Sequence, residues 1–351
     1  MQKVIRQVPN IHPIFDDIDN LFEITSEPAD TQIGLIPPTF DKSFKPLVDV
    51  FNTYGLENYV MDYMDFDYTQ IDTREFDSKN IILAFSGGKD SIAACLKYKE
   101  QGYNVYLYHL KHINPSISDE YIISESLAKL LDVPLYVDDV RFKGHHMWME
   151  HPMKNMIIAT GALNYGITHK IGTKVAFGNY TTSILPDNPF DRCAGDCMDM
   201  WDCYNNIIQR VIPNFEIMCT LSHMGETLDI MAKHLDLLDE SISCLCRHSL
   251  RPYRHNWVKE KFGIDLPKHR CGSCYKCVVE YIYMTDHNAI EFNEDYYKYC
   301  MGQLLNVAYM EGTPAFSMQT LWNKFMFYPM CESKLHIKLL SAIPLRRKIL
   351  W

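Results

Sequence analysis

The chain has 351 residues, of which 47% are hydrophobic and 22% are charged, a composition typical of a globular protein. Its net charge of −10 disfavours a general nucleic-acid-binding role, for which a basic surface is expected. No apolar run approaches the length of a membrane span, and the first residues lack the apolar core of a signal peptide. We therefore expect a cytoplasmic protein with no membrane partner.

Residues 1–78 carry no motif that names a chemistry. Aromatic side chains are too frequent there for a disordered tail, so we expect a folded extension with a strand over 66–71. From residue 80 onward, apolar strand-like segments alternate with helical ones. The expected strands cover 81–85, 104–109, 134–137, 175–178 and 215–220. The expected helices cover 91–101, 119–131, 153–169, 199–210 and 227–238.

This alternation predicts an α/β fold with a doubly wound, parallel five-stranded sheet. We divide the chain into an N-terminal extension over 1–78 and a nucleotide-binding domain over 79–240. A cysteine-containing segment follows over 241–285, and a helical C-terminal extension covers 286–351.

A glycine-containing turn, Ser86-Gly87-Gly88-Lys89-Asp90-Ser91, joins the first of these strands to its helix. Adjacent glycines let a backbone approach a ligand closely, and the N-terminus of a helix attracts anions. The two serines add hydroxyl donors, Lys89 adds a cation, and Asp90 could hold a magnesium ion. The turn therefore predicts a phosphate-binding site at the carboxyl end of a strand. The alternative is an ordinary strand-to-helix turn, in which glycine and serine are common.

The twelve cysteines are numerous for a chain in a reducing compartment, where they indicate metal ligands or buried thiols. Cys271, Cys274 and Cys277 have the spacing Cys-x2-Cys-x2-Cys, and a structural zinc ion needs four ligands. We favour Cys244 as the fourth ligand and keep Cys246 as the alternate.

Other interpretations of the cysteines remain open. His248 and His269 are weaker candidates for the fourth ligand. The three thiols could also be buried on a helix without a metal, or could bind an iron–sulfur cluster. A second group is too irregularly spaced for another metal site and is interpreted as core or pocket-lining thiols: Cys193, Cys197 and Cys203.

The turn matches the PP-loop signature Ser-Gly-Gly-x-Asp-Ser, so the chain resembles ATP pyrophosphatases with an adenine nucleotide alpha-hydrolase-like fold. Those enzymes cleave ATP to AMP and pyrophosphate and leave a substrate as its adenylate. The resemblance assigns the β- and γ-phosphates to Ser86, Gly87, Gly88 and Ser91. It implies that Lys89 lies near the phosphates or points outward, that Asp90 binds Mg²⁺, and that Gly178 borders the nucleotide pocket. Asp90, Lys89 and Ser91 are the implied catalytic residues.

Further segments, in the same order along the chain, resemble the 7-cyano-7-deazaguanine synthase family of queuosine biosynthesis. They are Lys154-Asn155, Gly178-Asn179, Asp196-Cys197, Ser243-Cys244 and Cys271 to Cys277. In that family the four cysteines bind zinc, so the resemblance implies ATP, Mg²⁺ and Zn²⁺ as cofactors. The chain departs from the family where Thr227 replaces an expected lysine and Glu280 an expected arginine. The interval between Cys244 and Cys271 is also longer, and both terminal extensions lack a counterpart.

The resemblance implies an ATP-dependent ligase that converts 7-carboxy-7-deazaguanine and ammonia to the nitrile, through an acyl-adenylate and an amide. The expected partners are therefore a deazapurine carboxylate and ammonia, without nucleic acid, and a homodimer is left open. Three alternatives compete. They are a PP-loop ligase acting on another substrate such as a protein, a tRNA sulfur-transfer enzyme with an iron–sulfur cluster, and a non-catalytic binding protein.

Overall fold

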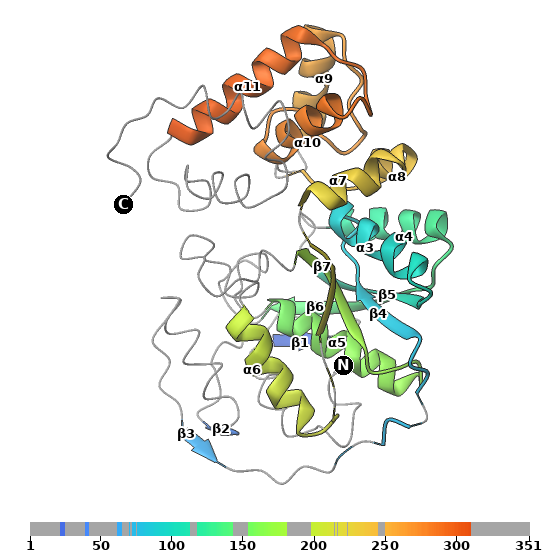
Figure 1. Cartoon of the computed structure of the whole chain (residues 1–351). Helices are drawn as coiled ribbons and strands as arrows, with labels where there is room; N and C mark the ends of the chain where they lie inside the picture. The colour runs from blue at the N-terminus through green and yellow to red at the C-terminus, as the bar shows by residue number, and fades with distance from the viewer. Residues whose placement is uncertain are drawn as a thin grey trace. The chain divides into compact units, whose positions relative to one another are not determined.

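The computed structural model describes residues 22–24, 39–41, 62–64, 70, 72–74, 76–112, 118–142, 154–180, 198–213, 215, 217–222, 224–244 and 250–309. The chain divides into two compact units, Met1–Ser222 and His223–Trp351, which are considered one at a time (Figure 1). Among the described residues, no helix combines the length and the apolar character that crossing a membrane would require. The finer domain boundaries given above remain predictions.

The first unit contains the expected parallel sheet (Figure 1). Its parallel strands are β4 (Asn80–Ala84), β5 (Asn104–His112), β6 (Leu135–Phe142), β7 (Val175–Tyr180) and β8 (Ile217–Leu221). They lie in the order β6-β5-β4-β7-β8, which is 3-2-1-4-5 when numbered along the chain. The first strand is thus the central one, and its Ile81, Ile82 and Leu83 are fully buried. The predicted α/β class and parallel sheet are confirmed.

The sheet has one strand more than predicted. Strand β1 (Phe22–Ile24) pairs antiparallel with β6, so the described sheet is six-stranded and mixed. Two further short strands, β2 (Thr39–Asp41) and β3 (Asp62–Met64), form a separate parallel pair. The strand expected over 66–71 falls outside the described residues except at Gln70, which is not in a strand.

The helices between the strands also follow the predicted alternation. They are α3 (Lys89–Glu100), α4 (Ser118–Leu131), α5 (Lys154–Thr168) and α6 (Met198–Gln209). Right-handed crossovers place α3 and α4 on one face of the sheet and α5 and α6 on the other, since the strand order reverses beside β4. Helix α3 packs against β7 and β8 as well as against its own strand, so it lies across the centre of the sheet.

The second unit is helical in its described part. Its helices are α7 (Met224–Ala232), α8 (Leu235–Glu240), α9 (Arg251–Phe262), α10 (Tyr275–Asp286) and α11 (Glu294–Tyr309). Rings from α9, α10 and α11 pack together, for example Tyr281 against Tyr296 with centroids 4.5 Å apart. Helix α11 provides the helix expected in the C-terminal extension, and residues 310–351 lie outside the described part of the chain.

The single helix predicted over 227–238 is wrong, because the chain breaks it into α7 and α8. In one continuous helix Leu235 would lie on the same stripe as the buried Leu228. Instead Leu235 is 44% exposed, and the restarted helix buries Leu237 and Leu238. The break therefore rotates the apolar face by changing which leucines point inward.

Candidate functional site

The loop after β4 forms a tight turn that ends in the N-terminus of α3. Gly87 has φ +71°, a left-handed backbone conformation that glycine adopts without steric cost. Gly88 is the N-cap residue of α3, and no side chain caps this end of the helix. The N–H of Gly88 donates to Ser86 Oγ (3.3 Å), and Ser91 Oγ donates to the carbonyl of Gly88 (2.9 Å). The two serines therefore fix the turn itself.

The position of this turn in the sheet is that of a ligand site in doubly wound folds. Strand β4 has β5 on one side and β7 on the other. The connection after β4 leads to β5, whereas the connection after β7 leads the opposite way, to β8. Ligands in such sheets bind outside the carboxyl ends of the strands at this reversal. The turn lies at the carboxyl end of β4, so its helix N-terminus faces the place where an anionic ligand is expected.

Gly178, the predicted border of the nucleotide pocket, lies at the same end of the sheet in β7. A Cβ atom built there would be 2.7 Å from the backbone nitrogen of Ser91 and 2.8 Å from the carbonyl carbon of Asp90. Because these are backbone atoms, no rotamer change could make room. The first turn of α3 therefore packs directly on β7, and this contact holds the loop in place. Its predicted role at the pocket stays a prediction.

We expect Gly178→Ala to displace the first turn of α3 and to lower the free energy of unfolding by about 1–3 kcal/mol, the usual cost of overpacking. The matched control is Gly302→Ala in α11, where nothing lies within 4 Å of the added methyl group. That change should be neutral or stabilising by about 0.5–1 kcal/mol, because alanine favours helices over glycine. Urea unfolding of both variants measures the difference, and equal stabilities would contradict the proposed close packing.

Lys89 and Asp90 form an ion pair at the start of α3. Lys89 Nζ lies 3.0 Å from Asp90 Oδ1 and 3.2 Å from Oδ2. The side chain of Lys89 is only 7% exposed, whereas that of Asp90 is 32% exposed. Lys89 therefore does not extend into solvent, which was one of the two orientations considered from the sequence. The arrangement places a buried cation and a more accessible carboxylate beside the helix N-terminus.

A histidine that was not identified from the sequence hydrogen-bonds the residue just before the turn. His109 Nδ1, at 2.7 Å, donates to the carbonyl of Phe85, the residue just before the turn. Ser124 Oγ in α4 lies 3.4 Å from the same nitrogen and 3.1 Å from the place where a Cβ of Gly87 would be. The signal in the sequence was a histidine near the carboxyl end of the strand that neighbours β4.

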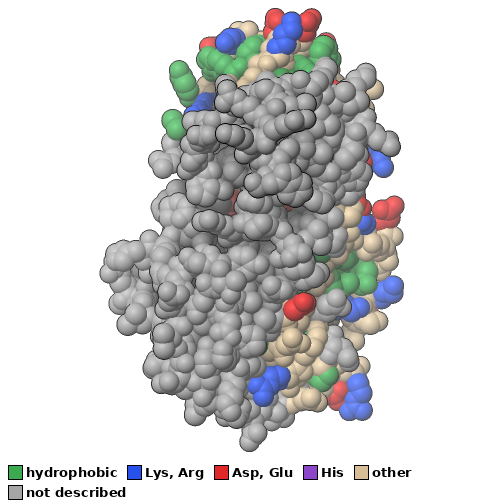
Figure 2. Space-filling view, turned by 60° about the vertical axis from the view of Figure 1, so that its left-hand side comes forward, with side chains coloured by type: hydrophobic (Ala, Val, Ile, Leu, Met, Phe, Trp, Pro, Cys, Tyr) green, Lys and Arg blue, Asp and Glu red, His purple; other side chains and the backbone are tan. Residues whose placement is uncertain are grey.

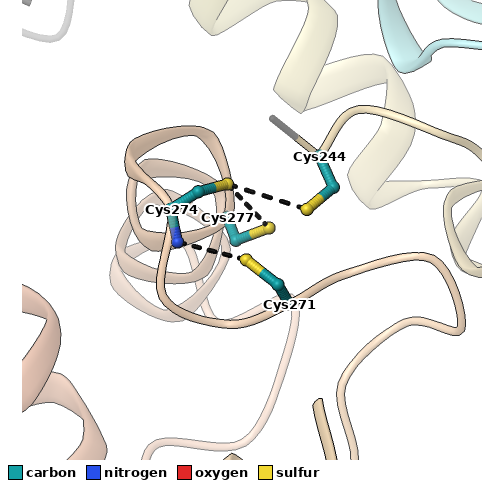
Figure 3. Close-up of side chains that lie close together, drawn as sticks. All are labelled: Cys244, Cys271, Cys274 and Cys277. Atoms are coloured by element: carbon teal, nitrogen blue, oxygen red, sulfur yellow. Dashed lines mark hydrogen bonds between the residues drawn. The ribbon is translucent and has the colours of Figure 1, made fainter. Parts of the chain in front are cut away.

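The second unit brings four cysteines together (Figure 3). The sulfur atoms of Cys244, Cys271, Cys274 and Cys277 all lie within 4.8 Å of one another. Cys274 Sγ is 3.8 Å from Cys244 Sγ and 3.4 Å from Cys277 Sγ. A tetrahedral zinc site with bonds of about 2.3 Å would need sulfur separations of about 3.8 Å. The quartet chosen from the sequence is thus close to the geometry that a four-coordinate metal requires.

The alternative ligands named from the sequence divide into two groups. Cys246 and His248 lie outside the described residues. His269 is described but does not belong to the metal-competent group found among the described side chains. Helix α10 begins after Cys274, so only Cys277 of the three downstream thiols lies on a helix. The helical stripe considered from the spacing is therefore not formed.

The turn around Cys271 stabilises the deprotonated form of its sulfur. Its sulfur accepts the backbone N–H groups of Ser273 (3.4 Å) and Cys274 (3.2 Å). The turn needs glycine at 272 for two reasons. Gly272 has φ +70°, which glycine adopts without steric cost. A Cβ there would also lie 2.8 Å from Val258 and 2.9 Å from Tyr296 Oη, so a larger residue would not fit. Hydrogen bonds to sulfur favour its charged form.

The four thiols influence one another strongly. Hydrogen bonds with Cys244, Cys274 and Cys277 lower the pKa of Cys271. Cys271 raises the pKa of Cys244, but Cys274 and Cys277 lower it, and the balance brings it to about 7. Interactions with Cys244 and Cys271 raise the pKa of Cys274 and of Cys277. Cys271 and Cys244 therefore lose their protons readily, whereas Cys274 and Cys277 would do so beside existing negative charge. A cation at the centre of the quartet would favour the thiolate form of all four.

The remaining segments of the family resemblance are distributed as follows. Lys154 begins α5, Asn155 is half-buried, and Asn179 lies in β7. Thr227 is fully buried in α7. Asp196-Cys197 and Cys193 lie outside the described residues, and Cys203 lies in α6.

No protein-family model and no curated protein matches the chain. Among solved structures, it is similar to a chain from Methanocaldococcus jannaschii described as a predicted subunit of tRNA methyltransferase. The two are 20% identical, with a TM-score of 0.27, over 52% of this chain and 87% of the other. That score is too low to assign a family or an activity. The strand order and the loop are themselves consistent with ATP-using PP-loop enzymes.

Proposed function

We propose that the protein is an ATP-using PP-loop enzyme that activates a carboxylate as its adenylate and releases pyrophosphate. One observation carries this proposal. The helix N-terminus of α3 has no side-chain cap, follows a left-handed glycine turn, and lies at the carboxyl end of the central strand. Such an end offers backbone N–H groups and a positive dipole to phosphate. Lys89 and Asp90 add the charges that a magnesium–phosphate complex needs.

Different residues of the turn would bind different parts of the ATP–magnesium complex. Backbone N–H groups from Gly87 onward and the hydroxyls of Ser86 and Ser91 bind the β- and γ-phosphates, and the Ser91 hydroxyl turns away from the Gly88 carbonyl to do so. Lys89 neutralises phosphate charge, and Asp90 holds Mg²⁺ directly or through water. A magnesium ion held by Asp90 would supply positive charge that stabilises the leaving pyrophosphate. Catalysis of this kind consists chiefly of positioning and charge neutralisation.

The reaction proposed for this site proceeds in two rounds of ATP use. A carboxylate oxygen attacks the α-phosphorus, the bond to the β-phosphate oxygen breaks, and pyrophosphate leaves. Ammonia then attacks the acyl carbon and displaces AMP, giving an amide and a proton. In the second round the amide oxygen attacks the α-phosphorus of another ATP and pyrophosphate leaves. Loss of AMP and of both amide protons then gives the nitrile.

The ordered segments that resemble the 7-cyano-7-deazaguanine synthase family support a deazapurine carboxylate as the substrate. Thr227 weakens this finer assignment, because a buried threonine cannot supply the ammonium group expected there. The deciding experiment measures AMP formation and product mass with ATP, Mg²⁺ and ammonia, with and without 7-carboxy-7-deazaguanine. Conversion of that acid to its amide or nitrile supports the assignment. If the acid neither stimulates AMP formation nor is converted, a different carboxylate is the substrate.

The partners proposed for this activity are small molecules. On the face drawn in Figure 2, the described Lys and Arg side chains lie among Asp and Glu side chains. The net charge of −10 supports a small-molecule substrate over nucleic acid.

The left-handed turn gives a test of the loop that does not need the substrate. We expect Gly87→Ala to weaken ATP binding by at least about 10-fold, because strain of about 1–2 kcal/mol at φ +71° would displace the turn. Gly102→Ala is the control, since Gly102 has φ +80° with nothing within 4 Å of an added Cβ. It should introduce a similar backbone strain and leave ATP binding unchanged. Equal ATP affinities in the two variants, measured by calorimetry, would contradict the role of the turn.

For the cysteine quartet we propose one structural zinc ion, held by Cys244, Cys271, Cys274 and Cys277. The support is the closed set of four sulfurs, since catalytic zinc sites keep an open position and structural sites do not.

A further inference from the structure

A buried arginine lies directly beside the cysteine quartet. Arg270 is 1% exposed, and its guanidinium group makes four hydrogen bonds. Its Nε and Nη2 donate to the two carboxylate oxygens of Glu280, at 2.7 and 3.0 Å. Its Nη1 and Nη2 donate to the carbonyl and hydroxyl oxygens of Ser241, at 2.5 and 2.9 Å. Four of the five N–H donors of the group are thereby used.

The partners of Arg270 belong to the two segments that carry the cysteines. Ser241 is the C-cap residue of α8 and lies three positions before Cys244. Glu280 lies in α10, three positions after Cys277. Arg270 itself immediately precedes Cys271, and its carbonyl accepts a hydrogen bond from His255 Nδ1 (2.9 Å) in α9. One side chain thus joins the upstream ligand segment to the downstream one.

Stability alone is a weak reason for such a pair. A buried ion pair loses hydration, and apolar residues of similar size often stabilise a protein equally well or better. An apolar residue at 270 could not hydrogen-bond Ser241. It therefore could not hold the segment that leads to Cys244 in position. The bidentate fork also sets the direction of α10 relative to this segment, which a lysine could not do with a single ammonium group.

We propose that Arg270 is a positioning residue that holds Cys244 in place beside Cys271, Cys274 and Cys277, so that all four sulfurs reach one metal ion. This inference rests on the metal site proposed above. It also explains the departure at Glu280: the carboxylate there is the partner of Arg270, and the two residues form one unit.

The test uses cobalt(II) as the probe in the full-length chain, because thiolate-to-cobalt charge-transfer bands grow with the number of bound sulfurs. The variants are Arg270→Met, Arg270→Lys and the double variant Arg270→Met with Glu280→Met. The double variant removes both buried charges, so it protects against misfolding caused by an unpaired Glu280. Lys298→Met, which breaks the exposed pair with Glu294, is the control for loss of an ordinary ion pair.

Wild type and Lys298→Met should show a tetrahedral four-thiolate spectrum. Both Arg270→Met variants should show a weaker charge-transfer band, as expected for three sulfurs. Their zinc affinity, from competition with a chelator, should fall about 10- to 100-fold, the size of loss seen when residues that orient metal ligands from outside are changed. Arg270→Lys should fall between.

The outcomes separate this inference from the metal site itself. A four-thiolate spectrum and unchanged zinc affinity in the folded double variant would overturn the positioning role while leaving the metal site intact. If wild type itself binds neither cobalt nor zinc, the metal site is wrong, and the positioning role is wrong with it.

Discussion

Replacing Asp90 with asparagine should lower ATP-dependent pyrophosphate release at least about 100-fold, the order of loss seen when one stabilising group is removed from an active site. Asparagine keeps the size of the side chain and an oxygen that Lys89 Nζ can donate to, so the buried lysine retains an acceptor. It removes the negative charge with which the side chain would hold Mg²⁺. The effect should therefore be on metal–nucleotide chemistry and not on folding.

Two quantities are measured: pyrophosphate release, and the dependence of ATP binding on magnesium. The binding measurement needs no acceptor substrate. Thermal unfolding checks that the variant is folded. Asp202→Asn, an exposed carboxylate in α6, is the matched control and should behave as wild type. Turnover by Asp90→Asn at the wild-type rate would refute the assignment of this carboxylate to the metal.

Removing one thiolate of the quartet should weaken metal binding and destabilise the second unit. We expect about one zinc per chain in the wild type and clearly less in Cys277→Ser after dialysis against a chelator, because a site with three sulfurs and one open position holds zinc more weakly. If free zinc exceeds its dissociation constant by about 1,000-fold, its loss removes about 4 kcal/mol of stability. A chelator should lower the unfolding temperature of wild type and leave that of the variant unchanged.

Cys300→Ser is the control for this experiment, since Cys300 is a fully buried thiol outside the quartet. It should keep its metal. Elemental analysis distinguishes the candidates: zinc without colour supports the proposal, whereas iron with acid-labile sulfide would replace it with an iron–sulfur cluster. Full metal content in Cys277→Ser would show that the quartet is not the site.

Much of the first unit could be predicted because its strands are short apolar runs separated by helices with clear boundaries. The parallel strands and the helices between them were found within a few residues. Strand β1 was missed because three residues, Phe22–Ile24, carry too little pattern to stand out. Its pairing depends on β6, which is distant in sequence, and not on local propensity.

The helices of the second unit were harder to find for different reasons. Helix α9 buries only Arg251 and Val258 among its described side chains, so it shows no apolar stripe. Its sequence signals were the proline near its start and Gly263 after its end, which has φ +68°. The break between α7 and α8 has neither glycine nor proline and follows from the packing of the leucines.

The candidate sites were predictable where the chemistry is local in sequence. The turn after β4 and the three cysteines at 271, 274 and 277 each lie within a few residues of one another. The supporting contacts are not local: His109 reaches Phe85, and Arg270 reaches Ser241. Such pairs become visible only when the fold brings distant segments together.

The pairing of β1 with β6 has a consequence for the order in which the chain is made. Phe22 pairs with Phe142, so β1 leaves the ribosome about 120 residues before its partner exists. At about 5–20 residues per second, this is a wait of about 6–24 s, during which β1 has no sheet to join. Until β1 docks, the backbone groups along the outer side of β6 form an open edge that another chain could pair with. Of the described strands, the one synthesised first therefore has to wait for a partner that is made after β4 and β5.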